Sequence, residues 1–321
     1  MNLERLPVSI IAPVRNAEKH LLNLRHQAEA ISLPHDEIIV IDDFSEDQTS
    51  RFLSLWALED SRVRIIKNKK QGLPNALNLG IQEATHTWMA RMDADDHYRS
   101  DRISRQLSLV TDQTVCIFSD YSFRTNSGRY LGFMPSAVHR FAVPVSLVNS
   151  RRTPHPVAIF RKDAVVEVGG YRSEDFPAED LSLWLRLCRA GDLISSNETL
   201  LEYSLSLGGV SLNSRKLQIN ARNRLIQSIG VGQEQLSRAQ NAFQEIIENY
   251  SGNSHSNLRA LLFMQDFSKL SGKSLSSLLF NSNLQIRPGE NFSAGATDIA
   301  NYYLMSVARA SFRIMHSFPL R

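Results

Sequence analysis

The first third of the chain alternates four short β-branched runs with three amphipathic helical patterns, and this alternation restricts the fold more than any other feature. A run such as Glu37–Ile41, apolar almost throughout, is typical of a strand buried on both faces of a sheet. Strands separated by helices need crossover connections, which are right-handed and give parallel pairing. The sequence therefore predicts an α/β protein with a Rossmann-like, doubly wound, mostly parallel sheet. The first four strands are expected at Val8–Ala12, Glu37–Ile41, Val63–Ile66 and Thr87–Arg91.

The three expected helices carry start signals. Pro13-Val14-Arg15-Asn16 predicts a loop that ends in an N-cap asparagine. Ser45-Glu46-Asp47-Gln48 matches a capping box, in which the serine and glutamine side chains satisfy free amides at the start of a helix. Pro74 suits the first turn of the third helix, where its missing N–H is not needed. Each helix thus begins shortly after one of the first three strands.

Two of these strands end in acidic residues. Asp42-Asp43 follow the second strand, and Asp93, Asp95 and Asp96 follow the fourth. Ligands of open parallel sheets bind beyond the carboxyl ends of the strands, so both groups could face one pocket. Crowded carboxylates repel one another unless a cation compensates them, and Mg²⁺ or Mn²⁺ carrying a phosphorylated ligand suits hard oxygen donors. An acidic surface loop that binds nothing is the alternative interpretation.

Composition excludes several classes of protein. Hydrophobic residues make up 42% and charged residues 21%, which excludes a largely disordered chain. A length of 321 residues suggests two domains. The net charge of +3 gives no argument for a nucleic-acid partner, and none is expected. The two cysteines, Cys116 and Cys188, are too few for a disulfide framework or a cysteine-ligated zinc site.

The sequence carries no pattern typical of membrane insertion or export. No apolar stretch reaches the roughly 18 residues that would indicate a transmembrane helix. The chain passes from Met1 into the first expected strand without a signal-peptide pattern. We therefore expect a cytoplasmic protein.

Beyond Gly128 the pattern is less regular. Strands are expected at Val115–Phe118 and Val157–Phe160, and a short helix at Ala164–Val168 that Gly169-Gly170 would stop. Phe176–Asp180 should introduce a stronger amphipathic helix. From about Leu212 the composition shifts to polar residues and leucine in long helical stretches. We expect a first domain over residues 1–211 and a helical region over residues 212–321.

The order of these features resembles the family-2 inverting glycosyltransferases, whose nucleotide-sugar-binding domain has the GT-A fold. The likeness covers roughly the first two thirds of the chain and would make residues 1–211 the catalytic domain. Each motif is modest, but together and in order they are specific. The motifs are Ser9–Asn16, Ile39–Ser45, Gly72 with Ala76–Asn78 and Gly80, Asp93–Asp96, His155-Pro156, Gly169–Tyr171, Ala178–Asp180 and Leu183–Arg186.

The resemblance implies a site for a sugar donor. Asp43 would bind the base of a uridine-type nucleotide, and Asp93 would hold the ribose. Asp95 would ligate the Mn²⁺ or Mg²⁺ ion that neutralises the diphosphate, with Asp96 as a substitute ligand. For each aspartate, helix capping or a solvated turn is the structural alternative. Further contacts with the donor or the pocket wall would come from Pro13, Arg15, Gly72, Asn75 and His155.

The resemblance also implies a general base. Asp180 would take the proton from an acceptor hydroxyl as that oxygen attacks the anomeric carbon, which would invert the configuration there. Glu179 is the nearest substitute. The structural alternative is that Asp180 is the N-cap of the helix that it introduces, and both roles are compatible.

One departure from the family pattern concerns the metal. Family members often carry an arginine and a histidine shortly after a tyrosine at the end of this domain, and the histidine can be a further metal ligand. Here Tyr203-Ser204-Leu205-Ser206 has serine at both places. This departure leaves three alternatives open: the metal binds weakly, another group such as His155 acts near the site, or activity has been lost.

The acceptor implied by the resemblance is a glycan or lipid-linked intermediate at the cytoplasmic face of the membrane. The apolar and aromatic stretch Ile299–Phe318 carries interspersed basic residues, as an interfacial helix would. Packing of this stretch on the catalytic domain, or across the interface of a homo-oligomer, is the alternative. Contact with the membrane would be peripheral.

We therefore expect a metal-dependent inverting glycosyltransferase that moves a sugar from a nucleotide-diphosphate sugar, most simply a UDP-sugar, to a hydroxyl in surface polysaccharide synthesis. The alternative is a non-catalytic partner subunit that uses the same fold to bind nucleotide or glycan. A dinucleotide-dependent oxidoreductase is disfavoured, because Pro13-Val14-Arg15-Asn16 stands where G-x-G-x-x-G would follow the first strand.

Overall fold

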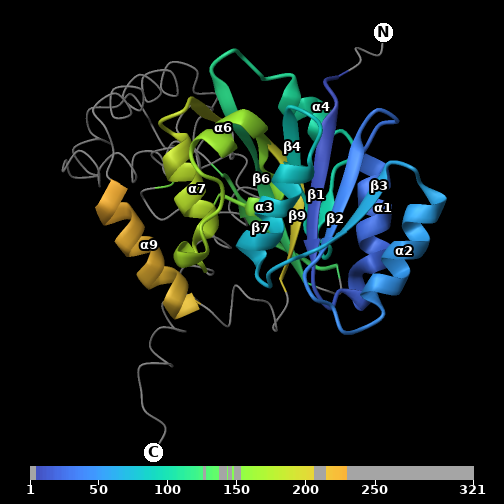
Figure 1. The fold of residues 1–321 in the computed structure, drawn as a ribbon. Helices are drawn as coiled ribbons and strands as arrows, with labels where there is room; N and C mark the ends of the chain where they lie inside the picture. Colours follow the sequence, from blue (N-terminus) through green and yellow to red (C-terminus); the bar gives the residue numbers. More distant parts are fainter. Residues whose placement is uncertain are drawn as a thin grey trace, which may run out of the picture.

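The computed structural model of the protein describes residues 5–125, 128–136, 143, 147, 153–205 and 215–229. In this part of the chain, nine strands form one mixed sheet that helices cover on both faces (Figure 1). The strands lie in the order β3-β2-β1-β4-β8-β6-β9-β5, and β7 pairs with β6 outside this path.

The strands and helices have the following bounds. The strands are β1 (Val8–Val14), β2 (Glu37–Asp42), β3 (Val63–Lys67), β4 (Trp88–Arg91), β5 (His97–Tyr98), β6 (Thr114–Thr125), β7 (Tyr130–Met134), β8 (Ile159–Arg161) and β9 (Asp192–Leu205). The α-helices are α1 (Leu21–Ile31), α2 (Thr49–Glu59), α3 (Leu73–Glu83), α4 (Arg102–Leu107), α6 (Lys162–Glu167), α7 (Glu179–Leu187) and α9 (Arg215–Ile229). Three short 3-10 helices are η1 (Glu18–His20), η2 (His155–Val157) and η3 (Ser173–Asp175).

Strands β3, β2, β1 and β4 are parallel, as the sequence predicted. The sheet becomes mixed at β8, which lies antiparallel to both β4 and β6. The strand expected at Val115–Phe118 is part of the longer β6, but the one expected at Val157–Phe160 begins only at Ile159 because η2 occupies the preceding residues. β9, which pairs along β6 and ends at the site described below, was not expected from the sequence.

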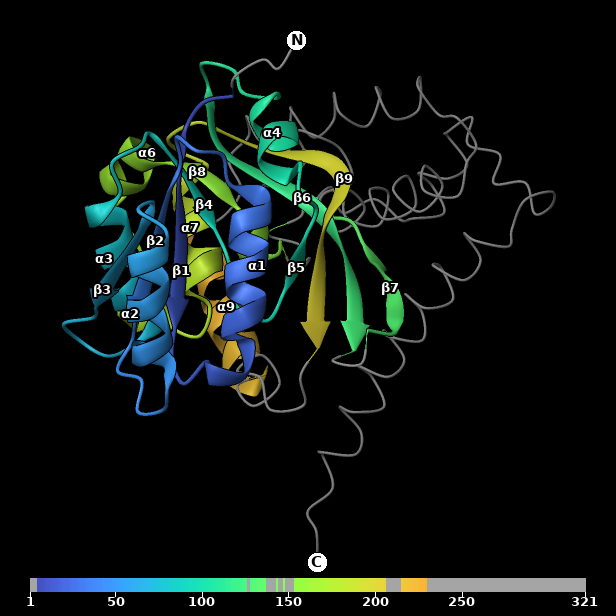
Figure 2. The ribbon, with the colours of Figure 1, turned by 90° about the vertical axis from the view of Figure 1, so that its right-hand side faces the viewer.

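The two faces of the sheet carry separate cores. Ile10 packs in one core with α1 and α2, whereas its neighbour Ile11 packs in the other with α3 and α7. Figure 2 looks onto the α1 and α2 face. Helix α3 lies so close to the sheet that a Cβ on Gly80 would come within 2.7 Å of Ile11 and 2.9 Å of Ile41. A larger residue at position 80 would force either these isoleucine side chains or the helix to shift.

Two of the predicted helix caps are wrong, for one shared reason. Asn16 and Ser45 contact each other across neighbouring loops: the Asn16 amide donates to Ser45 Oγ (3.0 Å), and the Glu46 amide donates to Asn16 Oδ1 (2.8 Å). Helix α1 begins only at Leu21, after η1, and α2 begins at Thr49. The side chains that the sequence assigned to helix starts instead join the loops that follow β1 and β2. Pro74 does lie in the first turn of α3, as expected.

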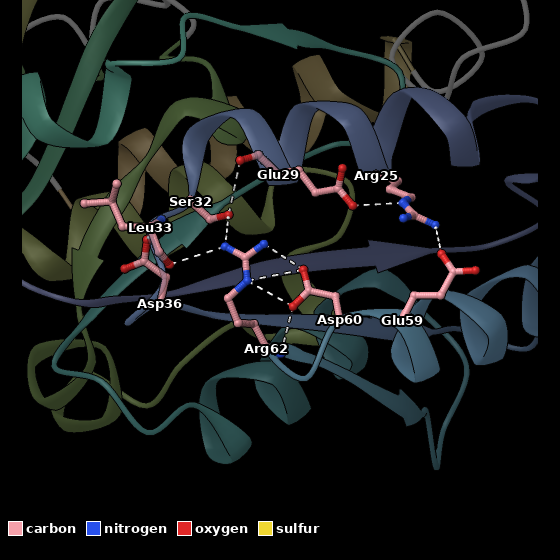
Figure 3. A network of polar contacts seen from close by, with 8 residues as sticks. All are labelled: Arg25, Glu29, Ser32, Leu33, Asp36, Glu59, Asp60 and Arg62. Carbon is pink, nitrogen blue, oxygen red and sulfur yellow. Dashed lines mark hydrogen bonds and ion pairs between the residues drawn. The ribbon is translucent and has the colours of Figure 1, made fainter.

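A network of paired charges lies around the amino ends of β2 and β3 (Figure 3). Arg62, just before β3, donates to both carboxylate oxygens of Asp60 and to Ser32 Oγ beyond the end of α1. Arg25 on α1 pairs with Glu29 and with Glu59 at the end of α2. These contacts join the connections on the side of the sheet away from the carboxyl ends of the strands.

Several expectations fall outside the described residues. They concern Ser206, the stretch Ile299–Phe318 and most of the helical region over residues 212–321, of which the structure describes only α9. Within the described residues, no helix has both the length and the apolar character that crossing a membrane requires.

Candidate active site

The acidic residues singled out from the sequence follow the carboxyl ends of β2 and β4. Asp43 comes directly after β2, and its backbone N–H donates to the Val14 carbonyl at the end of β1 (2.8 Å). Asp93, Asp95 and Asp96 form a loop after β4, which we call the acidic loop together with Ala94. Because β1 lies between β2 and β4 in the parallel part of the sheet, both groups stand at the same sheet edge.

Neighbouring donors hold the buried side chain of Asp43. Asn68 Nδ2 donates to Asp43 Oδ1 at 2.6 Å, and the Gly72 amide lies 3.0 Å from each carboxylate oxygen. Gly72 has a φ of 124°, which a side chain would make unfavourable. The amide of Gly72, which the sequence suggested for the donor, is therefore occupied by Asp43. Asp42 instead accepts from the Ser45 amide (3.0 Å) and organises the turn before α2.

Three other expected pocket residues lie around Asp43. Pro13 is half-buried within β1, and Arg15 is exposed just beyond it. With its amide oxygen turned towards Arg15, Gln71 accepts a hydrogen bond from Arg15 Nη1 at 2.7 Å. Asn75 in the first turn of α3 donates to the Gln71 carbonyl (3.0 Å) and accepts from Ser173 of η3 (3.3 Å). Asn75 thereby links α3 to the segment before α7.

An arginine that the sequence analysis did not single out pairs with the acidic loop. Arg91, the last residue of β4, is buried, and its guanidinium forms an ion pair with Asp93. The Asp93 backbone N–H donates to the Tyr98 hydroxyl at 2.8 Å. Asp93 is thus fixed through both its side chain and its backbone.

The other two aspartates of the acidic loop lack such compensation. Burial, and then the charge of Asp93, raise the pKa of Asp95. The same causes, with the charge of Asp95 added, raise the pKa of Asp96 well above its usual range. Asp96 Oδ1 accepts from the Ser204 amide on β9 (2.9 Å), but its Oδ2 is buried without a partner among the described residues. The loop therefore crowds three carboxyl groups, and its surroundings do not supply enough positive charge to keep all three ionised.

Side chains of α1 contact the acidic loop and the strand β5 that follows it. Asn23 on α1 donates to the carbonyls of Ala94 (2.8 Å) and Asp96 (3.0 Å). Gln27, one turn further along α1, accepts from the Tyr98 amide (2.8 Å). The acidic loop is therefore held in place by contacts with α1, β5 and β9.

Glu179 and Asp180 lie in the first turn of α7. The helix begins at Glu179 with Ala178 as its N-cap residue, so the structural alternative for Asp180, that it is the N-cap, is wrong. Burial, and then the charge of Asp180, raise the pKa of Glu179 to about 8. Glu179 Oε2 is buried without a hydrogen-bond partner among the described residues. At neutral pH Glu179 is therefore mainly protonated beside Asp180.

His155 contacts the segment that leads to α7. Its Nε2 lies 2.7 Å from the hydroxyl of Tyr171, and its ring packs edge-on against Trp184 of α7 at 5.8 Å between centroids. Burial, and then the charge of Arg91, lower the pKa of His155 well below its usual range. A neutral imidazole fits the expected role of His155 as a hydrogen-bonding wall residue.

A comparison with protein families identifies the family to which these residues belong. The model of the family described as Glycosyl transferase family 2 matches residues 9–168, a span that contains β1, β2, the acidic loop and His155. The chain belongs to this family.

Curated relatives of this glycosyltransferase include bacterial proteins whose matched region covers most of their length. It is 27% identical over 213 residues to the "Putative teichuronic acid biosynthesis glycosyltransferase TuaG" of Bacillus subtilis (strain 168), covering 65% of this chain and 83% of the relative. It is also 27% identical over 231 residues to the "UDP-Glc:alpha-D-GlcNAc-diphosphoundecaprenol beta-1,3-glucosyltransferase WfaP" of Escherichia coli, covering 70% and 87%.

Solved structures share the GT-A fold of this glycosyltransferase at low identity. The mannosyltransferase PcManGT from Pyrobaculum calidifontis, in complex with GDP-Man and Mn²⁺, matches with a TM-score of 0.59 and 14% identity, covering 94% of this chain and 87% of that one. S. aureus TarS 1-349 in complex with UDP-GlcNAc matches with a TM-score of 0.58 and 16% identity, covering 92% and 89%. At these identities the likeness establishes the fold alone.

The acidic loop of this glycosyltransferase has donors that fit a divalent cation. Carboxylate oxygens are suitable ligands for Mg²⁺ or Mn²⁺, and the unpartnered Asp96 Oδ2 and the repulsion around Asp95 would be relieved by positive charge. Among the described residues, however, no group of three or more His, Cys, Asp or Glu side chains could hold a metal ion. The protein donors would therefore have to be completed by phosphate oxygens of a substrate or by water.

Asp95 is the better placed of the two candidate ligands. Asp96 is only 1% exposed, and one of its oxygens already accepts from Ser204. Asp95 is half-buried. We therefore keep Asp95 as the first candidate ligand and Asp96 as its support.

Proposed function

We propose that this glycosyltransferase is a metal-dependent, inverting enzyme that transfers a sugar from a UDP-sugar to a hydroxyl of a glycan or lipid-linked acceptor in surface polysaccharide synthesis. The observation that carries the proposal is electrostatic. At the carboxyl edge of the parallel strands, the buried cation Arg91 pairs with Asp93 of the acidic loop, while Asp96 Oδ2 is buried without a partner among the described residues. A metal ion that carries a nucleotide diphosphate would supply the positive charge that this loop lacks.

The proposed donor site divides recognition between two loops. Asp43, fixed by Asn68 and Gly72, would accept a hydrogen bond from the N–H of a uracil ring. Asp93, fixed by Arg91 and Tyr98, would accept from a ribose hydroxyl. Asp95 would hold Mg²⁺ or Mn²⁺, and the bound ion neutralises charge on the departing diphosphate.

The proposed chemistry assigns different tasks to two neighbouring carboxyl groups. Asp180 takes the proton of the acceptor hydroxyl as that oxygen bonds to the anomeric carbon. The bond from that carbon to the nucleoside diphosphate breaks, and its electron pair leaves with the diphosphate. Glu179, with its pKa raised to about 8, is mainly protonated at neutral pH and is therefore the substitute, not the first candidate, for the base. Attack from the face opposite the leaving group inverts the carbon.

The names of the relatives support the class of donor and acceptor. WfaP is named for UDP-Glc and for a diphosphoundecaprenol-linked acceptor, and TuaG for teichuronic acid biosynthesis. We extend to this chain only the shared chemistry, a hexose or N-acetylhexosamine moved from a nucleotide sugar onto a surface-glycan precursor. On this proposal, residues 1–211 form the catalytic domain, and residues 212–321 contact the acceptor, the membrane surface at the inner face of the cell or a second copy.

Calorimetric titration of UDP, with and without Mn²⁺, tests the donor site. We expect binding that needs the metal in the wild type and falls at least about tenfold in Asp95→Asn. Asp112→Asn is the matched control, because Asp112 is exposed away from the acidic loop. If neither UDP nor another nucleotide binds with metal present, the non-catalytic alternative replaces the enzyme.

A further inference from the structure

A buried arginine on α4 lies behind the acidic loop. The side chain of Arg102 is fully buried, and its Nη2 donates to the Arg91 carbonyl (2.8 Å) while Nη1 donates to the Pro156 carbonyl (2.9 Å). The guanidinium carbon also lies 4.5 Å from the centre of the Tyr98 ring. One side chain thus joins the end of β4, the β5 residue Tyr98 and, 54 residues away, Pro156 in η2.

The two carbonyls mark the point where β4 and β8 stop pairing. The ladder between these strands runs from Trp88 opposite Arg161 to Ala90 opposite Ile159. The next hydrogen bond joins the Arg91 amide to the Ala158 carbonyl at 2.9 Å. Beyond it, the carbonyl of Arg91 accepts from Arg102 rather than from the backbone of the facing strand.

Arg102 therefore takes the place of the second hydrogen bond between Arg91 and Ala158, because the Ala158 amide donates to the His155 carbonyl instead (3.1 Å). On one side of it, Arg91 leads through Met92 into the acidic loop. On the other side, Pro156 follows His155 in η2. The length and planarity of the guanidinium set the separation of these two segments at the start of the candidate site, because its two parallel donors have a fixed spacing.

A second contact extends this control to Asp93. Tyr98 packs its ring against the Arg102 guanidinium, and its hydroxyl accepts from the Asp93 amide at 2.8 Å. A change in the position of the guanidinium would move the ring and with it the backbone of the acidic loop. Arg102 thus reaches Asp93 through β4 on one side and through Tyr98 on the other.

Burying the Arg102 guanidinium costs hydration free energy that packing alone would not require. Its two hydrogen-bond acceptors are backbone carbonyls, its Nε is buried without a partner among the described residues, and burial lowers its pKa to about 10. An apolar side chain of similar volume would avoid the loss of hydration. Such a replacement, however, would not hold the carbonyls of Arg91 and Pro156 at a fixed separation.

We propose that Arg102 is a positioning residue of the donor site, which sets the separation between the acidic loop and the His155-Pro156 turn and orients Asp93 through Tyr98. The inference rests on the proposed function, in that the site it shapes is the one proposed for a nucleoside diphosphate. Arg102 itself touches no substrate.

The test compares Arg102→Lys with Gln106→Leu. Lysine keeps the charge but cannot bridge two carbonyls with a planar fork. Gln106, one turn along α4, is an equally buried control whose amide donates to the carbonyls of Ile117 (3.1 Å) and Val157 (2.9 Å). We expect Arg102→Lys to weaken UDP binding in Mn²⁺ by about tenfold or more, as loss of a supporting residue does at metal sites. Gln106→Leu should lower the melting temperature comparably and leave that affinity within about twofold, since Gln106 contacts β6 and the last residue of η2 but not the acidic loop.

Hydrogen exchange of the backbone amides in residues 91–98 gives a readout that does not depend on nucleotide binding. We expect faster exchange there in Arg102→Lys but not in Gln106→Leu. If Arg102→Lys does not fold, Tyr98→Phe replaces it in both measurements, because it removes only the hydroxyl that contacts Asp93.

The outcomes separate the two proposals. Unchanged affinity and unchanged exchange in folded Arg102→Lys would overturn the positioning role, as would an equal loss of affinity in Gln106→Leu. Failure of the wild type to bind UDP would overturn the proposed function instead. In that case, exchange that is faster in Arg102→Lys alone still supports the positioning role, and equal exchange in all variants overturns it.

Discussion

Two buried glutamates at opposite edges of the sheet are satisfied in opposite ways. At the amino edge, Glu37 is 8% exposed and accepts hydrogen bonds from Ser9 (2.6 Å), from the Thr85 hydroxyl (2.8 Å) and from Arg64 (3.0 Å). At the carboxyl edge, Glu179 is 6% exposed, and its Oε2 has no partner among the described residues. Two residues of one type, buried to the same degree, thus differ in how their charge is satisfied.

The pKa values follow this difference. Burial alone would raise the pKa of Glu37, but the hydrogen bonds from Ser9, Thr85 and Arg64 outweigh it and lower the pKa. Burial and the charge of Asp180 raise the pKa of Glu179 to about 8. Satisfied carboxylates stabilise a fold, whereas unsatisfied ones are held in place at a cost and are typical of sites that receive a ligand or a proton. Each of the following predictions tests one side of this contrast.

The largest effect is expected at Asp180. If the carboxyl edge holds the general base, Asp180→Asn should lower turnover by about 10²- to 10⁴-fold while UDP binding persists. The assay is release of nucleoside diphosphate from a UDP-sugar, paired with a binding titration. Glu174→Gln is the control, because Glu174 is exposed in η3 nearby. Turnover retained in Asp180→Asn would remove this residue from the mechanism.

The adjacent residues Asp42 and Asp43 allow the contrast to be tested within one pair. Both are buried, but Asp42 organises the turn before α2, and Asp43 faces Asn68 and Gly72. We expect Asp43→Asn to weaken UDP binding by about 10- to 100-fold, the effect of losing one charge-assisted hydrogen bond. Asp42→Asn should lower the melting temperature with little change in affinity. Equal affinity losses in the two variants would mean that Asp43, too, has only a structural role.

The pair Glu37 and Glu179 predicts opposite dependences of stability on pH. The stabilisation by Glu37 is fully present above its usual pKa of 4.5 and is lost as the pH falls through the lowered folded value. For Glu179, the folded state binds the proton more tightly than the unfolded state. Its contribution to the free energy of unfolding therefore falls as the pH rises from 4.5 to about 8.

Two glutamine variants separate these contributions. Glu37→Gln should lose roughly 2–3 kcal/mol of stability at pH 7 and progressively less at lower pH, because it leaves donors around a neutral group. Glu179→Gln should match the wild type near pH 4 and gain on it by up to about 5 kcal/mol above pH 8, because the pKa shift from 4.5 to about 8 corresponds to that amount at about 1.4 kcal/mol per pKa unit. Urea unfolding at several pH values measures both. If the stability change caused by each substitution varied with pH in the same direction, the two glutamates would not differ in how their charge is satisfied.

The sequence predicted the parts of this molecule that local patterns determine. The first four strands, their parallel order and the turn of α3 at Pro74 follow from β-branched runs and from the fixed φ of proline. Asp43 and the acidic loop directly follow β2 and β4 in sequence. They were predicted to share one ligand site because ligands bind beyond the carboxyl ends of parallel strands. The resemblance to glycosyltransferase family 2 then supplied the roles that spacing alone could not.

The failures have a physical cause in contacts between distant residues. Asn16 and Ser45 look like helix caps in sequence, yet they bond each other across two loops. Arg102 reaches the carbonyl of Pro156, 54 residues away, and no local pattern indicates such a partner. Arg91 offered the one signal that was overlooked, a charged residue at the end of a strand that is otherwise apolar. Such a residue usually needs a partner, and its partner is Asp93.

The smallest expected effect concerns the ion pairs on the surface near the amino edge. Arg25 donates to Glu29 at 2.8 Å and to Glu59 at 2.5 Å, linking α1 to α2 (Figure 3). Both partners are more than one third exposed, so water and salt screen the attraction. A double-mutant cycle with Arg25→Ala and Glu59→Ala should give a coupling of about 0.2–1 kcal/mol that shrinks further at high salt. A coupling of several kcal/mol would be far more than solvent-exposed charges can contribute. The difference between Glu37 and Glu179 would then have to be explained by ion pairing near the amino edge and not by how their buried oxygens are satisfied.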